Sequence, residues 1–243
     1  MRGARGFLTA FVVVATLSLG ACHDTPEEPA IGTPGTSFYG TYTDQAGHAG
    51  TVELAGVSQM TSSVVLAQGG GISLIGELRI GGSPIVQLTG RYDAAAGTLA
   101  FASVDGAYDF SGSVVSNQVK GFGTGPGGPA TFVVFLGGTA TSVDTFCGTA
   151  TCTSPPGCAV GGDFNVAVSG SEVLMTGSVD GAVTVATGTT SASVLQLTIA
   201  QDPVNLTVEG TITGNTISGT WTDATSGTSG TWTASASQCQ ESG

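Results

Sequence analysis

From residue 38 onward the chain alternates apolar and polar residues with a period of two, and no helical period lasts longer than one turn. This alternation is typical of β-strands with one buried and one wet face. It is clearest in residues 72–80, 86–92, 108–114, 163–169, 205–212 and 216–222. Residues 132–136 are apolar throughout, which predicts a strand covered on both faces. The folded part is therefore expected to be all-β.

Turn signals separate these segments about every 8 to 12 residues, as is typical of all-β barrels and sandwiches. Gly81-Gly82, Asp180-Gly181 and Gly214-Asn215 are hairpin-type connections. Short connections favour an antiparallel meander, in which consecutive strands pair. About sixteen strands divide near residue 140 into two related halves. We expect meander barrels or sandwiches, either two small β units or one large one.

One hairpin pattern occurs at both ends of this β region. Residues 40–52 and 219–232 share a Gly-Thr-aromatic-Thr-Asp strand, a polar turn and a Gly-Thr strand, and residues 90–99 are a third relative. The alternation places Tyr42 and Trp221 inward and the threonines outward. We interpret the hairpin as a structural repeat whose aromatic residue anchors a core.

The segments 40–47 and 88–93 resemble strands of the avidin and streptavidin family, and lipocalins also carry Gly-x-Trp on their first strand. The resemblance implies an up-and-down β-barrel. It does not imply biotin binding, because the ligand-binding Asn and Ser of that family would fall at Asp44 and His48. The chain also lacks the pocket tryptophans, since no Trp precedes Trp221.

The N-terminus predicts export and lipidation. Arg2 and Arg5 precede an apolar run of 13 residues, 7–19, which is too short to span a bilayer and is typical of a signal peptide. The run ends in Leu19-Gly20-Ala21-Cys22, which resembles the lipobox of bacterial lipoproteins. The resemblance implies acylation of Cys22 and attachment to the cell envelope, above all the outer membrane. An ordinary secretory signal with a chance cysteine is the alternative.

The expected organisation is a signal peptide (1–21), a disordered tether (22–37), β unit 1 (38–138), a Cys-rich connector without strand pattern (139–162) and β unit 2 (163–239). The tether is rich in proline and acidic residues and has no apolar period. An integral outer-membrane barrel is disfavoured, because aromatic residues make up only 7% of the chain and form no interfacial girdles.

The charge balance excludes some partners. Asp and Glu number 17 against 5 Lys and Arg, and no Lys or Arg follows Lys120. Phosphate backbones are bound by clustered basic residues, so nucleic acid is not an expected partner. Direct adsorption to anionic lipid is disfavoured for the same reason, and the acidity suits a soluble surface.

Four cysteines besides Cys22 are expected to form disulfides, the default in an exported protein. If residues 163–169 and 228–236 are neighbouring strands of a closed second unit, Cys158–Cys239 and Cys147–Cys152 are the favoured pairs. Cys152–Cys158 with Cys147–Cys239 is nearly as well supported. A four-Cys zinc site is the competing interpretation, but the spacing lacks the usual Cys-x2-Cys knuckle.

Other reactive groups are few. His48 is the only histidine after residue 37, and with Asp44 it could form at most a weak metal pair. Glutamates on strand faces could pair as the carboxylates of a glycosidase: Glu53, Glu77, Glu172 and Glu209. No nucleophile elbow, phosphate loop or dinucleotide fingerprint is present. No metal or cofactor is expected.

The sequence therefore predicts a lipid-anchored envelope protein, with the membrane as one partner, that acts as a non-catalytic binding module. A protein, peptide or carbohydrate ligand could contact the barrel mouths or the hydroxyl-rich face of Thr216, Ser218, Thr220 and Thr222. The alternatives are a structural coat or spacer without a ligand and, less favoured, a carboxylate-based hydrolase.

Overall fold

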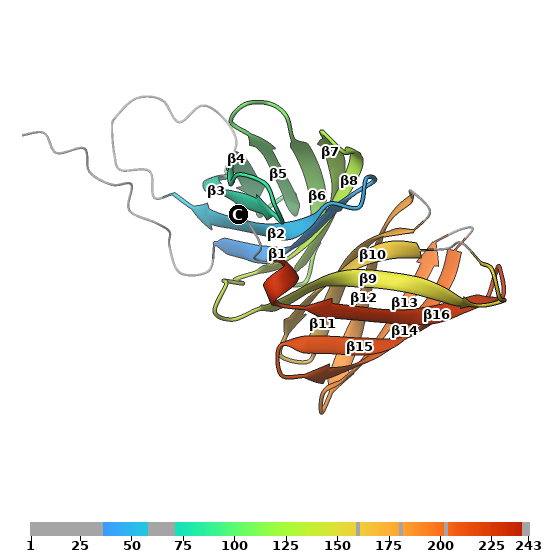
Figure 1. The fold of residues 1–243 in the computed structure, drawn as a ribbon. Coiled ribbons are helices and arrows are strands. Elements are labelled where there is room, and N and C mark those ends of the chain that lie inside the picture. Colours follow the sequence, from blue (N-terminus) through green and yellow to red (C-terminus); the bar gives the residue numbers. More distant parts are fainter. Residues whose placement is uncertain (1–35, 58–70, 159–160, 180–181, 202–203, 240–243) are drawn as a thin grey trace, which may run out of the picture.

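The computed structural model describes residues 36–57, 71–158, 161–179, 182–201 and 204–239. These residues form sixteen β-strands and one short 3-10 helix, η1 (Ser237–Cys239), arranged as two closed antiparallel barrels of eight strands each (Figure 1). The prediction of an all-β meander is confirmed, and of the forms considered, two separate barrels are the one observed.

The first barrel is an up-and-down meander closed by pairing of its first and last strands. Its strands are β1 (Ser37–Asp44), β2 (Ala49–Gly56), β3 (Ile72–Ile80), β4 (Val86–Asp93), β5 (Thr98–Ser103), β6 (Asp109–Val115), β7 (Gln118–Gly125) and β8 (Gly128–Leu136). Consecutive strands pair throughout, as the short glycine-containing turns predict.

The second barrel repeats the same topology. Its strands are β9 (Asp144–Ser154), β10 (Gly161–Ser169), β11 (Glu172–Val179), β12 (Ala182–Ser191), β13 (Val194–Gln201), β14 (Val204–Thr213), β15 (Thr216–Asp223) and β16 (Thr228–Ser235). β9 pairs with both β10 and β16 and so closes the barrel. The second unit therefore begins near residue 144, within the segment expected to be a strandless connector.

The sequence pattern did not predict β9, because most of its inward residues are small. Phe146 and Ala150 lie in the core of the second barrel, and Cys152 packs against that core. Between them stands Gly148, which has no side chain to mark an apolar period. The outward Thr149 and Thr151 are exposed, so the sequence of this segment resembles a polar linker. In the structure its residues nevertheless alternate regularly between the two faces of a strand.

The interiors of both barrels are filled by aromatic and aliphatic side chains. Glycines on neighbouring strands make room for the largest of these. Trp232 lies over Gly210 and Gly219, where an added Cβ would fall 2.7 Å from the indole ring and 2.6 Å from its nitrogen, respectively. Phe132 covers Gly121 in the first barrel in the same way. The high glycine content of the chain is thus partly a packing device.

The repeated hairpins occupy non-equivalent places. Residues 40–52 form the first hairpin of barrel 1, whereas residues 219–232 form the last hairpin of barrel 2. As expected, the aromatic residue of each points inward: Tyr42 is fully buried and Trp221 is 3% exposed, each within the core of its own barrel. A common core-anchoring role explains the repeat better than a common position.

The two barrels pack side by side through β1 and β8 on one side and β10, β11 and β12 on the other (Figure 1). A separate apolar cluster joins them, made of Tyr39, Val133, Phe135, Val143, Ala167 and Leu174. Val133 and Phe135 are the outward residues of β8, so the strand at 132–136 is covered on both faces, as predicted. Its outer cover is the second barrel.

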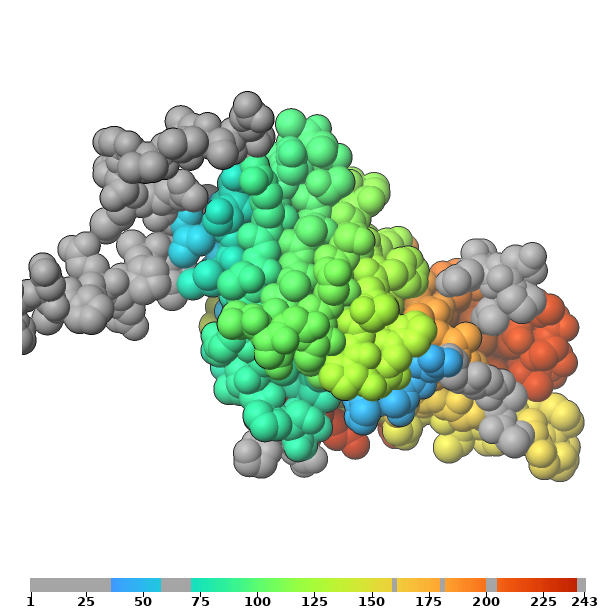
Figure 2. Space-filling model, turned by 90° about the horizontal axis from the view of Figure 1, so that it is seen from above, coloured from blue at the N-terminus to red at the C-terminus, as the bar shows by residue number. Residues whose placement is uncertain are grey.

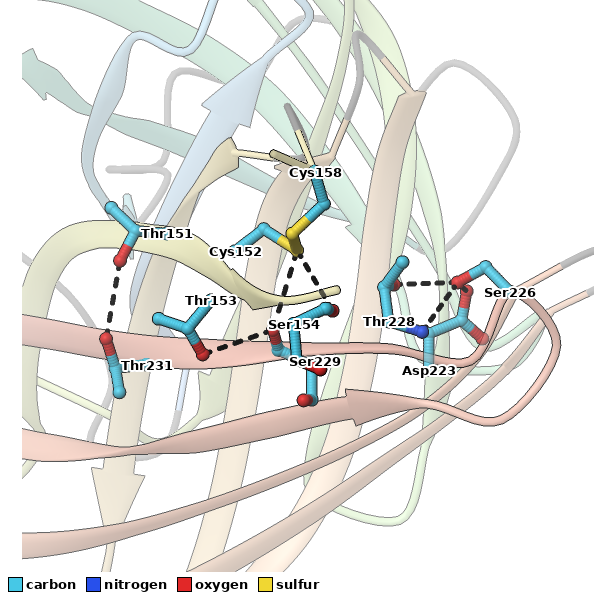
Figure 3. The surroundings of a disulfide bond; sticks show 10 residues. All are labelled: Thr151, Cys152, Thr153, Ser154, Cys158, Asp223, Ser226, Thr228, Ser229 and Thr231. Atoms are coloured by element: carbon cyan, nitrogen blue, oxygen red, sulfur yellow. Dashed lines mark hydrogen bonds between the residues drawn. A yellow bond between two sulfur atoms is a disulfide. The ribbon is translucent and has the colours of Figure 1, made fainter. Parts of the chain in front are cut away.

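The four cysteines form the disulfides Cys147–Cys239 and Cys152–Cys158. The favoured pairing was wrong, and the alternative pairing is observed. The error follows from β9, which lies between β10 and β16 and carries Cys147 opposite Ser235 at the C-terminal end of the last strand. Cys152 and Cys158 bracket the turn that leaves β9 (Figure 3).

Candidate functional site: a cleft between the barrels

A cleft of about 360 Å³ opens where the β1–β2 turn of the first barrel meets β9 and β10 of the second. Its lining residues are Gln45, Ala46, Gly47, Thr149, Ala150, Gly161, Gly162, Asp163 and Ser178. Figure 2 shows the β1–β2 turn, in blue, lying against the second barrel. Both barrels contribute walls, so the site exists only in the assembled pair.

A buried polar layer forms one side of this junction. Thr43 Oγ1 donates to Thr176 Oγ1 (2.8 Å), which donates to Thr41 Oγ1 (3.2 Å). The side-chain amide of Asn165 donates to Thr43 Oγ1 and to the carbonyl of Tyr42. Thr41 and Thr43 do point out of their barrel, as predicted. Instead of meeting solvent, however, they are fully buried against the second barrel.

The junction therefore changes character along β1. Tyr39 lies in the apolar cluster, Thr41 and Thr43 lie in the hydrogen-bonded layer, and Gln45 lines the open cleft. Polar groups at the buried end are mostly satisfied within the protein, whereas those at the open end face a cavity. The gradient leaves the cleft as the part of the junction able to accept another molecule.

Asp44 and His48 stand beside the cleft and contact each other directly. Asp44 is 1% exposed and accepts hydrogen bonds from His48 Nδ1 (2.8 Å), from the His48 backbone N–H (2.9 Å) and from the Tyr42 hydroxyl (3.1 Å). Burial, and then the charge of Asp44, raises the pKa of Tyr42 far above its ordinary value. Tyr42 thus stays protonated and serves as a donor to the carboxylate.

The predicted Asp44–His48 pair forms, but no third ligand joins it. In the part of the chain that the structure describes, no group of three or more His, Cys, Asp or Glu is placed to hold a metal ion. The pair instead orders the β1–β2 turn, because Asp44 also accepts from the backbone of that turn.

Asp163 lines the cleft, and the sequence analysis did not single it out. It sits half-buried on the cleft wall, in contact with Gly47 across the junction. Burial and the nearby Asp44 raise the pKa of Asp163, while His48 opposes the rise. The alternation places Asp163 on the outer face of its strand. No sequence signal says that a turn from the other barrel covers that face.

A second, smaller cavity lies behind the cleft, at the end of barrel 2. Its lining residues are Ala150, Gly161, Gly162, Phe164, Val179, Leu206 and Trp221. Three of these also line the cleft, so the two hollows share one rim. The inner cavity measures about 10 Å³, room for one water-sized group. Trp221 Nε1 is buried without a hydrogen-bond partner, whereas Trp232 Nε1 donates to the Glu209 carbonyl at 2.9 Å.

The four candidate glutamates do not meet at this cleft. Glu53 and Glu77 face each other across β2 and β3 in a groove of about 320 Å³ on the outside of barrel 1. Arg79 (2.5 Å) and Gln87 (3.3 Å) occupy the two oxygens of Glu77. Glu172 lies elsewhere, on barrel 2.

Glu172 has a different partner set, which fixes the two barrels together. Asn117 Nδ2 donates to one of its oxygens at 2.6 Å, and Gln118 Nε2 approaches the other at 3.4 Å. Asn117 lies in the β6–β7 turn of barrel 1, and Gln118 is the first residue of β7. The Glu209 carboxylate accepts a long bond from Gln196 Nε2 at 3.3 Å, on the outer face of barrel 2.

The predicted hydroxyl-rich face is real. Thr216, Ser218, Thr220 and Thr222 are all exposed on the outer face of β15. The face continues onto β16 and β9, where Thr231 and Thr151 lie 3.3 Å apart through their hydroxyl oxygens (Figure 3).

Cys22, the predicted lipidation site, lies outside the described residues. None of the helices within those residues has the length and apolar character needed to cross a membrane. The fold and the cleft define a tandem of two eight-stranded up-and-down barrels with a shared ligand-sized cleft. Comparison with models of protein families, with curated proteins and with solved structures gave no match.

Proposed function

We propose that the protein is a lipid-anchored, non-catalytic binding module of the bacterial cell envelope and that it binds its ligand in the cleft between the barrels. The observation that carries the proposal is the cleft itself, formed by both barrels and lined by Gln45, Asp163 and Ser178. Ligand pockets in proteins commonly measure 300 to 1,000 Å³, a range that includes this cleft.

The location differs from the one expected for a lipocalin-like barrel. Tyr42 and Phe132 fill the interior of barrel 1, and Trp232 and Phe164 fill that of barrel 2. Close-packed interiors of this kind have no room for a ligand. The cleft takes the place of the lumen as the binding site, and its size favours a small ligand or the end of a longer chain.

The anchor supports an envelope location. The basic start, the apolar run and the box ending in Cys22 together match a lipoprotein signal. Two or more acyl chains hold a protein on a membrane stably, because each buried methylene contributes about 0.8 kcal/mol. The acidic barrels would then stand away from the anionic surface on residues 22–37.

Blocking the cleft tests the proposal. Thr149 is an exposed outward residue of β9 that lines the cleft, and Thr211 is an exposed outward residue of β14 that does not. Thr149→Phe fills the cleft, and Thr211→Phe is the matched control. Both would be compared with the natural chain in capturing small molecules from envelope extracts, with native mass spectrometry as the readout. We expect a captured mass for the natural chain and the control but not for Thr149→Phe. Equal capture by both variants would remove the cleft as the site.

A structural spacer is the second candidate, and the filled interiors favour it. Two barrels with packed interiors, joined by an apolar cluster, would form a spacer that needs no ligand. The same experiment separates the two functions, because a spacer captures no molecule from the extract in any of the three forms.

A further inference from the structure

The two disulfides differ in how far they can be reached from solvent. Cys147 and Cys239 are each 2% exposed, and η1 lies against β9, β16 and β2 of the other barrel. Cys152 and Cys158 are both partly exposed, and every residue between them, 153–157, is exposed. Their bond lies at the end of β9 (Figure 3). Thiol–disulfide exchange requires access to a sulfur atom, and exposed disulfides are the labile ones. The short bond can therefore exchange in the folded protein, whereas the long one is shielded.

Backbone contacts hold this part of barrel 2 without the short bond. Cys152 lies opposite Gly230 of β16, and the Cys158 backbone N–H donates to the Pro155 carbonyl at 3.1 Å. Neither contact needs the two sulfurs to be joined. The bond also joins residues only 6 apart, and a short loop restricts the unfolded chain less than a long one does. The protein is therefore expected to stay folded with Cys152 and Cys158 as free thiols.

The short bond also fastens one wall of the cleft. Gly161 pairs with Thr151, and Gly162 with Ala150, at one end of the β9–β10 ladder, and both glycines line the cleft. The bond closes the connection just beyond this end of the ladder. A glycine has no side chain to pack, so the position of these two residues depends on their backbone pairs and on the chain at either side. Opening the bond removes one of those restraints.

We propose that Cys152–Cys158 is a redox switch for the cleft, opened by an external dithiol, and that Cys147–Cys239 is a permanent structural bond. In the oxidised form the β9–β10 connection is closed, and Gly161 and Gly162 are held against β9. In the reduced form these two residues are less restrained, and the cleft binds its ligand more weakly. This inference rests on the proposed function, because it names a regulation of the same site.

The exchange balances in two steps. One thiolate of the dithiol attacks a sulfur of the pair, so that the Cys152–Cys158 bond breaks and a mixed disulfide forms. The second thiol of the reductant then displaces the protein sulfur from the mixed disulfide. The reductant leaves as its own disulfide, two electrons have passed to the protein, and the two protons of the dithiol end on Cys152 and Cys158.

Selective reduction of the folded chain tests whether the two bonds differ. Dithiothreitol is the probe, and the full chain carries Cys22→Ala, which removes the lipid and the fifth cysteine. Samples taken during the reaction are blocked with iodoacetamide and mapped by peptide mass spectrometry. We expect Cys152 and Cys158 to be blocked while Cys147–Cys239 is still intact. Equal reduction of the two bonds, or earlier loss of Cys147–Cys239, would overturn the inference.

Hydrogen exchange followed by NMR tests the effect on the cleft wall. The double variant Cys152→Ser with Cys158→Ser stands for the reduced form and cannot respond to dithiothreitol. The backbone amides of residues 149–151 and 161–162 should exchange faster in the reduced chain and in the double variant than in the oxidised chain. The amides of β3 and β4, in barrel 1, should exchange at the same rate in all three. An unchanged rate at the wall would contradict the proposed switch.

Ligand capture separates the switch from the proposed function. The oxidised chain, the selectively reduced chain and the double variant are each mixed with envelope extract, with native mass spectrometry as the readout. We expect a captured mass for the oxidised chain and a weaker or absent one for the other two. Equal capture by all three would overturn the switch and leave the cleft standing as the binding site. Capture by none would remove the proposed function, and with it the effect on a ligand. The mass mapping and the hydrogen exchange would still decide whether the bond opens and loosens the wall.

Discussion

The side-chain amide of Asn165, in the second barrel, donates a hydrogen bond to the hydroxyl of Thr43, in the first, and both side chains are fully buried. Two outer barrel faces have therefore become interior. The same amide also donates to the carbonyl of Tyr42. The junction is held by directional bonds as well as by apolar contact, which fixes how the barrels face each other and hence the shape of the cleft.

Asn165→Ala should destabilise the junction by about 1 to 3 kcal/mol, because it leaves the Thr43 hydroxyl and the Tyr42 carbonyl without this donor in a buried place. Both tryptophans lie in barrel 2, so urea unfolding followed by fluorescence reports on that barrel. Asn205→Ala, on an exposed position of β14, is the control and should stay within about 0.5 kcal/mol of the natural chain. Equal midpoints for the two variants would show that the junction adds nothing to stability.

These junction residues also mark the limit of sequence reasoning. A period of two says which residues share a face, and it placed Thr41 and Thr43 outward correctly. It cannot say whether that face meets water, because a hydroxyl suits both water and a buried partner. β8 was the exception: Val133 and Phe135 are too apolar for a wet face, so its outer cover could be predicted.

The predicted start of the second barrel and the favoured disulfide pairing were both wrong, and for the same reason. Gly148 and Ala150 make the inner face of β9 too small to show a period. Without β9, β10 and β16 became false neighbours, and Cys158 was placed beside Cys239. The cleft could not be predicted from the sequence, for a different reason. Asp163 and Gly47 belong to different barrels, and no local pattern encodes how two barrels dock.

Gly219→Ala should strongly destabilise the second barrel. An added Cβ would fall 2.6 Å from Trp232 Nε1 and would also collide with the Glu209 carbonyl, so both the ring and the strand would have to move. Overpacking of this kind costs about 1 to 3 kcal/mol or more. Thermal unfolding and the tryptophan fluorescence maximum, to which Trp221 and Trp232 both contribute, would measure the change.

Gly161→Ala is the matched control for that substitution. Gly161 is also a strand glycine, and its nearest neighbour would lie 3.6 Å from the new Cβ, an ordinary contact. We expect stability within about 0.5 kcal/mol of the natural chain. Similar losses in both variants would mean that strand flexibility, and not the space under Trp232, explains these glycines.

The two disulfides should contribute unequally. Cys147–Cys239 joins residues 92 apart, whereas Cys152–Cys158 joins residues 6 apart. In the chain-entropy model these loops correspond to about 4.6 and about 2.2 kcal/mol, respectively. Replacing both cysteines of a pair by serine, one pair at a time, should therefore lower the urea midpoint more for the long loop. The reverse order would indicate that the disulfides do not stabilise the protein mainly by lowering the entropy of the unfolded chain.

Cys22→Ala should release the protein from membranes. The lipobox predicts that acyl chains on this residue provide the attachment, and the acidic barrels offer no basic patch to replace it. Cell fractionation with antibody detection would show the natural chain in the membrane fraction and the variant in the soluble fraction. Ser18→Ala, in the apolar run outside the box, should keep the natural distribution. A Cys22 variant that stays on the membrane would refute lipidation as the anchor.

Ionisation of Asp163 should lower the free energy of unfolding as pH rises. A carboxylate whose pKa is lowered by folding has the opposite effect. Burial and the nearby Asp44 raise the pKa of Asp163 in the folded protein above the ordinary value of 3.8, against the smaller effect of His48. The folded state thus binds this proton more tightly than the unfolded chain does. The resulting stabilisation is complete below the unfolded pKa and is lost as pH rises through the folded pKa.

Asp163→Asn should therefore be more stable than the natural chain at neutral pH, by a fraction of a kcal/mol, and the difference should vanish at acidic pH. Scanning calorimetry between about pH 3 and about pH 8 would measure it. Asp105→Asn should behave oppositely. Hydrogen bonds from Ser103 and from the Ala107 backbone lower the pKa of Asp105, so that variant should be less stable at neutral pH. If Asp163→Asn instead became less stable than the natural chain as pH rose toward neutral, the ionised carboxylate of Asp163 would stabilise the folded protein. The cleft would then hold a positive group not yet accounted for.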